Sequence, residues 1–386
     1  MYYLMNKDYV LLSFEIQGEG IFETCIEIDR QGLLPPWFRT IEQWVSARSV
    51  AKHRKHIQKI LSETGGNTLS GFIRLTHCLS LNDTLWVKSD CEILTWDKVS
   101  LYRNKFNDVI SKLSFDGAGL YGEQMSVTSP ELTTDGNFDK CWKRENGTIK
   151  LLKAGSSGAG NAGREPYSEV LASQVFEKIC GTRSVQYNLT RFNGRAVSEC
   201  KLFTSEKYGY RSAAVFNLAG LSITELLREY DKFGDVDIFK RMLVADAVCI
   251  NTDRHYGNFG FLVDNDTFER VSMAPVFDFN LAMFPYADWQ DGFSDMETWI
   301  SERGPRIGTN YYEVAKALLT SEVRSELINL KDLDLVVETD DKFPTTRLRI
   351  VNEFKNVQID KILGNKRQFN FEPFKVAEDV LDEIGI

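Results

Sequence analysis

The fold of this chain is decided by one stretch of sequence, Asn251-Thr252-Asp253-Arg254-His255-Tyr256-Gly257-Asn258. The stretch directly follows residues 239–250, a mostly apolar segment that is typical of a buried helix. Polar groups at the end of a buried helix cost free energy unless they find hydrogen-bond partners or a ligand. So dense a polar run at this place therefore indicates a functional loop.

The spacing inside the stretch is informative. Asp253 and Asn258 are five residues apart, the separation found in the catalytic loop of protein kinases. There the aspartate accepts the proton of the attacking hydroxyl, and the asparagine holds a metal ion. His255 lies between them, and we expect it to contribute to catalysis by bracing the loop through a hydrogen bond, since phosphoryl transfer depends on positioning. Simple capping of turns is the alternative explanation.

A second acidic residue should lie beside this loop. Residues 259–263 and 268–273 have the composition of two strands joined by a turn at 264–266. A hairpin returns the chain to its starting point, so we expect Asp278, just beyond the hairpin, to lie near Asn258. Mg²⁺ takes hard oxygen ligands, usually one or two protein carboxylates together with phosphate oxygens. Asn258 and Asp278 are therefore the predicted metal ligands.

A phosphoryl-transfer site also needs a cation that neutralises phosphate charge and an acid that orients this cation. Lys153 ends a predicted strand, and Glu169 follows sixteen residues later on a helix predicted over 166–180. Lys150 is the alternative lysine. Glu165 is the alternative acid, although the helix dipole alone explains an acid at a helix start.

Two further segments are candidates for contacts with a nucleotide. Residues 129–137 join two predicted strands and could fold over the phosphates, with Thr134 and Gly136 as the candidate binding residues. An ordinary hairpin loop is the alternative explanation. Residues 202–205 have the position expected of a connection between two lobes that contacts adenine.

A glycine-rich loop at 155–163 contains Gly158-Ala159-Gly160-Asn161-Ala162-Gly163, which matches the G-x-G-x-x-G of dinucleotide-binding turns. Three features argue against that function. The first glycine comes late after the strand, the predicted helix starts only after the third glycine, and the strand carries lysines. We interpret the loop as a mobile connection between the Lys153 strand and its partner helix.

The chain divides into three predicted parts. Residues 1–115 predict a small α+β module with two strands over 9–30 and a helix beginning at Thr40. Residues 125–215 are strand-rich with one helix, and residues 216–386 are mostly helical. The predicted fold class is therefore α+β, a bilobal protein-kinase-like fold with a strand-rich N-lobe and a helical C-lobe, preceded by the N-terminal module.

The composition restricts the class of function. The 386 residues are 43% hydrophobic and can fill more than one core. A formal net charge of −9 disfavours direct binding of nucleic acid. Seven scattered cysteines argue against a disulfide framework and a zinc site. Because the sequence has neither a signal peptide nor a long apolar run, we expect a cytoplasmic protein that does not contact a membrane.

With these residues in place, the chain resembles HipA-like serine/threonine kinases over roughly residues 125–365. The resemblance rests on residues 251–258, which match the family's N-T-D-x-H-x-x-N, and on residues 274–278, Ala-Pro-Val-Phe-Asp, which match L-A-P-x-Y-D. Lys153 corresponds to the lysine of the family's ATP-binding strand. The match is long and specific.

The resemblance implies ATP and Mg²⁺ as cofactors and a protein as the substrate. It implies that Asp253 is the catalytic base, that Asn258 and Asp278 bind magnesium, and that Lys153 contacts the ATP phosphates. The resemblance suggests three further features for this chain. They are self-phosphorylation, a role as the toxin of a toxin–antitoxin pair, and an antitoxin-like regulator.

The chain departs from the family pattern in three places. Gly257 stands where members commonly carry Lys or Arg. Residues 129–137 match the family's phosphate loop only loosely and leave Thr133 and Thr134 as candidate self-phosphorylation sites. Residues 1–115 do not match the usual N-terminal domain of HipA toxins.

Two other functions stay open. Residues 253–258 also fit the D-R-H-x-x-N of phosphatidylinositol kinases, so a lipid or small-molecule kinase is the first alternative. The acidic net charge is poorly suited to an anionic membrane surface. A non-catalytic pseudokinase that recruits a partner is the second alternative, although a scaffold does not need Asp253, Asn258 and Asp278 together.

Overall fold

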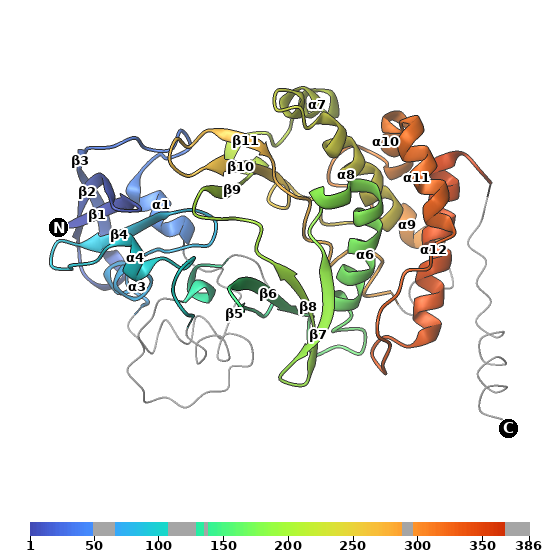
Figure 1. The fold of residues 1–386 in the computed structure, drawn as a ribbon, viewed down its shortest axis with the longest axis horizontal. Helices are drawn as coiled ribbons and strands as arrows, with labels where there is room; N and C mark the ends of the chain where they lie inside the picture. The colour runs from blue at the N-terminus through green and yellow to red at the C-terminus, as the bar shows by residue number, and fades with distance from the viewer. Residues whose placement is uncertain (49–65, 107–128, 135–137, 288–295, 367–386) are drawn as a thin grey trace. The chain divides into compact units, whose positions relative to one another are not determined.

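The computed structural model describes residues 1–48, 66–106, 129–134, 138–287 and 296–366 (Figure 1). The chain forms two compact units. Unit 1 comprises Met1–Ala154, Glu199–Asn217 and Gly260–Ala274, and unit 2 comprises Gly155–Ser198, Leu218–Phe259 and Pro275–Ile386. Each unit is therefore assembled from segments that are far apart in the sequence.

Unit 1 contains an antiparallel sheet with the strand order β3-β2-β1-β4. Its strands are β1 (Tyr2–Asn6), β2 (Tyr9–Gln17), β3 (Thr24–Arg30) and β4 (Leu85–Ser89). β2 and β3 are the two strands predicted over 9–30, whereas β1 and β4 were not predicted. A short 3-10 turn, η1 (Gly20–Phe22), joins β2 to β3.

Two helices of this region begin at side-chain caps. The N–H of Gln43 donates to the hydroxyl of Thr40 over 3.2 Å, which confirms the predicted start of α1 (Ile41–Arg48). Thr68 caps α3 (Leu69–Thr76) by accepting from the N–H of Gly71. Both helices bury apolar side chains, including Val45 and Phe72, in one core with β1 and β2.

A second core of unit 1 joins parts of the chain that the sequence predicts to be separate. Trp86 and Trp96 of the N-terminal region share this core with Trp142 of β5 (Lys140–Glu145) and Ile149 of β6 (Thr148–Ala154). Trp96 begins the short helix α4 (Trp96–Val99). The N-terminal region is thus continuous with the strands that follow it, because neither buries these large side chains alone.

The turn between β5 and β6 is formed by Asn146 and Gly147. Both residues have positive φ, 48° and 78°, as a type I′ turn requires, and Glu145 pairs with Thr148. The four-stranded sheet has the order β5-β6-β8-β7, with β7 (Tyr187–Phe192) and β8 (Arg195–Lys201). The division between the two units falls inside β8.

The hairpin predicted over 258–273 is confirmed. β10 (Gly260–Asp264) and β11 (Arg270–Met273) are antiparallel, and Phe261 pairs with Met273. β9 (Tyr208–Ser212) pairs with the other edge of β10. These three strands belong to unit 1, whereas the sequence places the hairpin in the helical part. Short 3-10 turns lie elsewhere, at η2 (Pro130–Thr133), η3 (Gly181–Arg183) and η4 (Ala213–Phe216).

Unit 2 is built around α8 (Val236–Cys249), whose side chains are almost all buried. α8 contacts α6 (Glu165–Cys180), α7 (Ile223–Asp231), α10 (Tyr311–Leu318) and α12 (Thr345–Leu363). Figure 1 shows α6 and α8 side by side. The remaining helices of this unit are α9 (Met296–Ser301) and α11 (Ser321–Lys331).

α6 and α12 follow their sequence signals. α6 has a proline in its first turn and ends at Gly181, as predicted. α12 begins after Pro344 and ends at Leu363, directly before Gly364. α6 belongs to unit 2 because it buries Phe176 and Ile179 against the helices there, although the sequence assigns it to the strand-rich part. The compact units therefore do not follow the boundaries 125–215 and 216–386.

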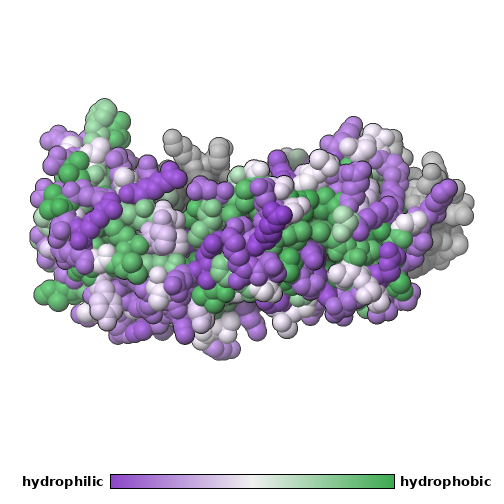
Figure 2. Space-filling view, turned by 90° about the horizontal axis from the view of Figure 1, so that it is seen from above, coloured by the Kyte–Doolittle hydropathy of each residue, from purple (hydrophilic) through white to green (hydrophobic). Residues whose placement is uncertain are grey.

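The surface is mixed in character. On the face seen in Figure 2, hydrophobic residues reach the surface in several places among hydrophilic ones. In the described part of the chain, no helix combines the length and the apolar character needed to cross a bilayer.

Candidate active site

The functional loop starts at a sharp turn after α8. Ile250 has a left-handed backbone conformation (φ 45°, ψ 56°), which ends the helix and turns the chain. The carbonyl of Cys249 accepts from the N–H of Met283 over 2.9 Å. The hydroxyl of Tyr311 donates to the carbonyl of Asn251 over 2.7 Å. Residues 251–258 are thus held at their start by two distant parts of unit 2.

A buried ion pair supports the loop from behind. Nε of Arg254 lies 3.0 Å from Oδ2 of Asp246, and the two side chains are only 2% and 4% exposed. The same guanidinium donates to the carbonyls of Asn258 (2.8 Å) and Phe277 (2.6 Å). Arg254 therefore ties the end of the loop at Asn258 to α8 and to the residue that precedes Asp278.

Further hydrogen bonds fix the two predicted functional residues of the loop. The amide Nδ2 of Asn258 donates to the carbonyl of Asp253 over 2.9 Å, and the N–H of Asp253 donates to Oδ1 of Asn251 over 3.2 Å. Because the amide nitrogen of Asn258 binds the carbonyl of Asp253, its amide oxygen remains available to another partner. The amide orientation is therefore the one that a metal ligand needs.

His255 braces the loop, as the sequence predicts. Its ring nitrogen Nδ1 accepts from the N–H of Gly257 over 3.0 Å, which assigns the proton of a neutral ring to Nε2. A Cβ atom on Gly257 would lie 2.7 Å from the His255 ring. The glycine that departs from the family pattern is thus required by the position of this ring.

Asp278 has an unusual backbone conformation, with φ of 63°. Such values are uncommon for residues other than glycine and are concentrated at functional sites. The N–H of Asp278 donates to the hydroxyl of Tyr187 over 3.3 Å. The following residue, Phe279, stacks its ring on that of Phe176 of α6, with the ring centroids 4.1 Å apart. Packing of Phe279 therefore holds Asp278 in its strained conformation.

The charge of Asp278 acts on Asp253, so the structure places these two residues near each other. Burial, which has the largest effect, and the negative charge of Asp278 raise the pKa of Asp253 above its ordinary value. The positive charges of His255, Arg306 and Arg254 act in the opposite direction, and the effect of His255 is larger than that of Asp278. Two like charges in a half-buried place repel each other unless a cation lies between them. The pair is therefore suited to a divalent ion.

The donor set fits Mg²⁺. The carboxylate of Asp278 and the amide oxygen of Asn258 are hard ligands that could hold Mg²⁺ beside Asp253, and the ion would take its other oxygens from water and phosphate. Among the residues that the structure describes, no cluster of three or more His, Cys, Asp and Glu side chains has the arrangement of a metal site. An ion at Asn258 and Asp278 would therefore depend on oxygens from a bound phosphate.

Glu169 contacts the segment around Asp278. The carboxylate is completely buried on α6. Its Oε1 accepts from the N–H of Phe279 over 3.4 Å, and its Oε2 accepts from the hydroxyl of Ser198. The helix predicted to carry an orienting acid thus touches the backbone next to the predicted metal ligand, a contact that the sequence does not reveal.

The lysine alternatives differ in their surroundings. Nζ of Lys150 lies 3.0 Å from Glu145 and 2.9 Å from Glu199, which explains this lysine as part of a surface ion-pair network. Lys153, three residues further along β6, is buried. Lys153 belongs to unit 1 and Glu169 to unit 2. Their predicted pairing stays a prediction.

Glu165 has a local structural function. Its Oε1 accepts from the N–H of Ser156 (3.0 Å) and from the hydroxyl of Tyr286 (2.7 Å). The side chain is 1% exposed. Glu165 therefore closes the base of the glycine-rich loop, and this contact accounts for an acid at the start of α6.

The candidate phosphate loop is described only in part. The hydroxyl of Thr134 accepts from the indole N–H of Trp142 over 2.9 Å and donates to the carbonyl of Pro130 over 2.5 Å. The hydroxyl of Thr133 donates to the carbonyl of Leu79. Gly136 lies outside the described residues. Both threonine hydroxyls thus contact protein groups, and their predicted contact with a nucleotide stays a prediction.

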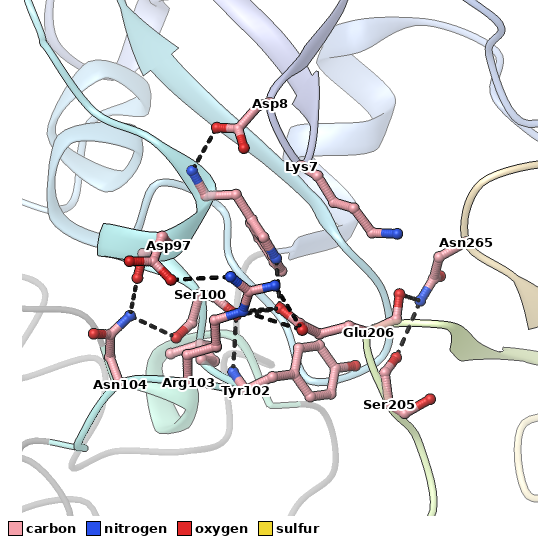
Figure 3. Close-up of polar contacts among 12 residues, drawn as sticks. Lys7, Asp8, Asp97, Ser100, Tyr102, Arg103, Asn104, Ser205, Glu206 and Asn265 are labelled. Atoms are coloured by element: carbon pink, nitrogen blue, oxygen red, sulfur yellow. Dashed lines mark hydrogen bonds and ion pairs between the residues drawn. The ribbon is translucent and has the colours of Figure 1, made fainter.

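The connection at 202–205 is anchored within unit 1 (Figure 3). The carboxylate of Glu206 accepts from Arg103 (2.8 Å) and from the indole N–H of Trp96 (2.6 Å). The amide of Asn265 donates to the carbonyl of Ser205 over 3.1 Å. Sequence reasoning missed this anchor, because nothing near Glu206 in the sequence indicates its partners.

Solved structures include chains of similar fold, although no protein-family model and no curated protein matches the sequence. The HipA chain of the Shewanella oneidensis MR-1 toxin–antitoxin complex with HipB and operator DNA has a TM-score of 0.51 at 11% identity. The match covers 95% of this chain and 98% of that one. The proinflammatory kinase CtkA of Helicobacter pylori has a TM-score of 0.42 at 18% identity, over 64% of this chain and 95% of CtkA.

The two likenesses have different weight. A TM-score of 0.42 adds nothing to the assignment. The match to HipA runs through almost the whole of both chains, including the N-terminal region, for which the sequence offers no match. At 11% identity it shows the fold. The chain has the bilobal, kinase-like α+β fold of HipA.

Proposed function

We propose that this protein is an ATP- and Mg²⁺-dependent serine/threonine protein kinase of the HipA-like kind. The observation that carries the proposal is the convergence of Asp253 and Asp278 in unit 2, where the charge of one raises the pKa of the other. Asn258 lies on the same loop, with its amide nitrogen bound to the backbone of Asp253. These are the parts that phosphoryl transfer requires.

Each residue has a distinct function in this proposal. Asp253 accepts the proton of the substrate hydroxyl, and its raised pKa makes it a stronger base than an exposed aspartate. Asn258 and Asp278 hold Mg²⁺, which neutralises charge on the transferred phosphoryl group. His255 keeps the loop in shape through Gly257. Arg254 acts through the backbone and so positions the other residues.

Lys153 is the proposed contact to the ATP phosphates. Its buried ammonium group and the ion pairs that occupy Lys150 favour Lys153 as this residue. Glu169 orients the site through its bond to the N–H of Phe279. A protein substrate and an antitoxin-like regulator belong to the same proposal, because HipA occurs in a complex with HipB and operator DNA. Toxin activity and a cytoplasmic location are likewise proposed.

Incubation of the full chain with Mg²⁺-ATP, followed by intact-mass measurement, tests the proposal. We expect an added phosphoryl group, or phosphate transfer to a protein substrate in a lysate depleted of its own kinases. The Asp253→Asn variant should show neither. Firm sedimentation with anionic liposomes, together with lipid phosphorylation, would instead favour the lipid-kinase alternative. ATP binding without transfer to any substrate would favour a pseudokinase.

A further inference from the structure

The glycine-rich loop that the proposed function leaves unused lines a cavity of about 320 Å³. The whole cavity lies within unit 2. Its walls are the loop Gly155–Gly163, the turn between β7 and β8, and the segment around Asp340. Asp253, Asn258 and Asp278 are not among its lining residues. A cavity of this size accepts a small molecule or one modified side chain.

The cavity is lined by more cationic than anionic side chains. Arg191, Arg195 and Lys342 line it, together with the carboxylate of Asp340. Arg191 also lies 3.9 Å from Glu338, and the formal net charge of the whole chain is −9. A local reversal of the overall charge attracts anions.

The one carboxylate is already satisfied. Asp340 accepts from the hydroxyl of Tyr167 (2.6 Å) and from Arg191 (2.9 Å). It also accepts from the backbone N–H groups of Lys342 and Phe343. These hydrogen bonds lower the pKa of Asp340, so it stays ionised and fixes the position of Arg191. Lys342 then supplies cationic charge to the cavity, and Arg195 lines it beside the loop.

The two ends of the loop lie in close contact. A Cβ atom on Gly155 would lie 2.6 Å from Oε2 of Glu165 and 2.7 Å from Cα of Gly163. Only glycine therefore fits where the two ends of the loop meet. Nη2 of Arg195 donates to the carbonyl of Gly155 over 3.2 Å, which holds this cation against the loop.

The middle of the loop offers backbone donors. Gly158 has φ of 100°, and a Cβ atom there or on Gly160 would meet nothing within 4 Å. Within the described part of the chain, the N–H groups of residues 157–161 have no hydrogen-bond acceptor. Glycine-rich loops with unpaired N–H groups bind phosphate when cationic side chains lie nearby.

We propose that this cavity binds a phosphate group, carried by a small molecule or by a phosphorylated side chain, at a site separate from Asp253 and Asp278. Arg195 and Lys342 neutralise its charge, and the loop supplies backbone N–H groups. The loop leads directly into α6, which carries Glu169. A bound phosphate would therefore restrict the loop and stabilise the N-terminal turn of that helix.

Titration calorimetry of the full chain with inorganic phosphate, at constant ionic strength, tests the site. We expect saturable binding that Lys342→Gln weakens by about three- to tenfold, as for loss of one partly exposed charged contact. Lys316→Gln removes an exposed lysine of α10 and is the matched control, with unchanged binding. Absence of saturable binding, or equal weakening in both variants, would overturn the proposal.

Two further binding measurements distinguish this site from the proposed catalytic centre and identify the source of the phosphate. Binding should be unchanged in Asp278→Asn, and loss of binding there would place the phosphate at the metal site and refute the inference. Phosphoserine should bind, whereas serine should not. Tighter binding of phosphoserine than of inorganic phosphate indicates a phosphorylated side chain, and equal binding indicates a small molecule. Neither readout depends on kinase activity.

Discussion

The carboxylate of Asp278 raises the pKa of Asp253, although 25 positions separate the two residues in the sequence. The hairpin of β10 and β11 lies between them in the chain. Burial of Asp253 has the larger effect in the same direction, and the positive charges of His255, Arg306 and Arg254 oppose it. A bound cation would favour the ionised forms of both carboxylates further.

The pKa of Asp253 should respond to its neighbour. Because the folded pKa lies above the unfolded one, ionisation of Asp253 subtracts stability above the folded pKa, and the loss disappears as the pH falls through that value. Asp278→Asn should lower the pKa of Asp253 by removing the repulsion, while burial keeps it above normal. NMR titration of the labelled carboxyl measures this. An unchanged pKa in the variant would contradict the proximity of the two groups.

Mg²⁺ should have a similar effect on the wild-type protein. An ion held by Asp278 and Asn258 beside Asp253 favours the ionised forms of both carboxylates, so the apparent pKa of Asp253 should fall when Mg²⁺ and a non-hydrolysable ATP analogue are added. The same titration with the analogue and EDTA is the control. Kinase activity should rise with pH through the pKa of Asp253, because the base must be ionised.

Arg254→Met should destabilise the fold. It leaves the buried carboxylate of Asp246 with the amide of Asn251 but without its cationic partner, and it frees the carbonyls of Asn258 and Phe277. Loss of one member of a buried pair costs about 3–5 kcal/mol. Urea unfolding measures the change. The double variant with Asp246→Leu should recover part of the loss, and strict additivity of the two effects would contradict a direct ion pair.

Gly257→Ala should disturb the catalytic loop. The new Cβ would lie 2.7 Å from the His255 ring, so the ring must move and its bond to the N–H of residue 257 must break. We expect a loss of about tenfold or more in kcat with little change in the KM for ATP. In a His255→Ala background the same substitution should have a much smaller effect. Equal effects in both backgrounds would exclude this steric explanation.

Glu169→Gln should weaken the support of the Asp278 segment. The amide keeps the shape of the side chain but removes the charge that accepts from Phe279 and Ser198. A bond to a buried charged group contributes about 1.5–3 kcal/mol. We therefore expect weaker Mg²⁺-dependent ATP binding and a lower Tm. Ser198→Ala should show a smaller change in the same direction, and no change in either variant would refute the positioning function.

Much of the site could be predicted from the sequence, because its parts are local. The spacing of Asp253 and Asn258, and the return of the chain through the β10–β11 hairpin, depend on short-range signals of turn and strand. The sequence also contains a local signal for the buried ion pair behind the loop. Asp246 is an isolated acid in an apolar helix, eight residues before Arg254, and such an acid usually has a buried cationic partner.

The rest depends on contacts between distant segments, which no local pattern encodes. The bond from Phe279 to Glu169 joins residues 110 positions apart. The partners of Glu206, including Arg103, come from the N-terminal region, which the sequence predicts to be a separate module. Each of these contacts lies within one unit, so each unit combines segments that are far apart in the sequence.

The central claim is that Asp278 and Asn258 hold a magnesium ion beside Asp253 for phosphoryl transfer from ATP. The most direct test measures binding of a non-hydrolysable ATP analogue to the full chain, with Mg²⁺ and with EDTA. We predict tight binding that requires Mg²⁺ and is lost in Asp278→Asn, whereas Asp253→Asn binds normally but transfers no phosphate. Metal-independent binding that is equal in wild type and Asp278→Asn would contradict the account.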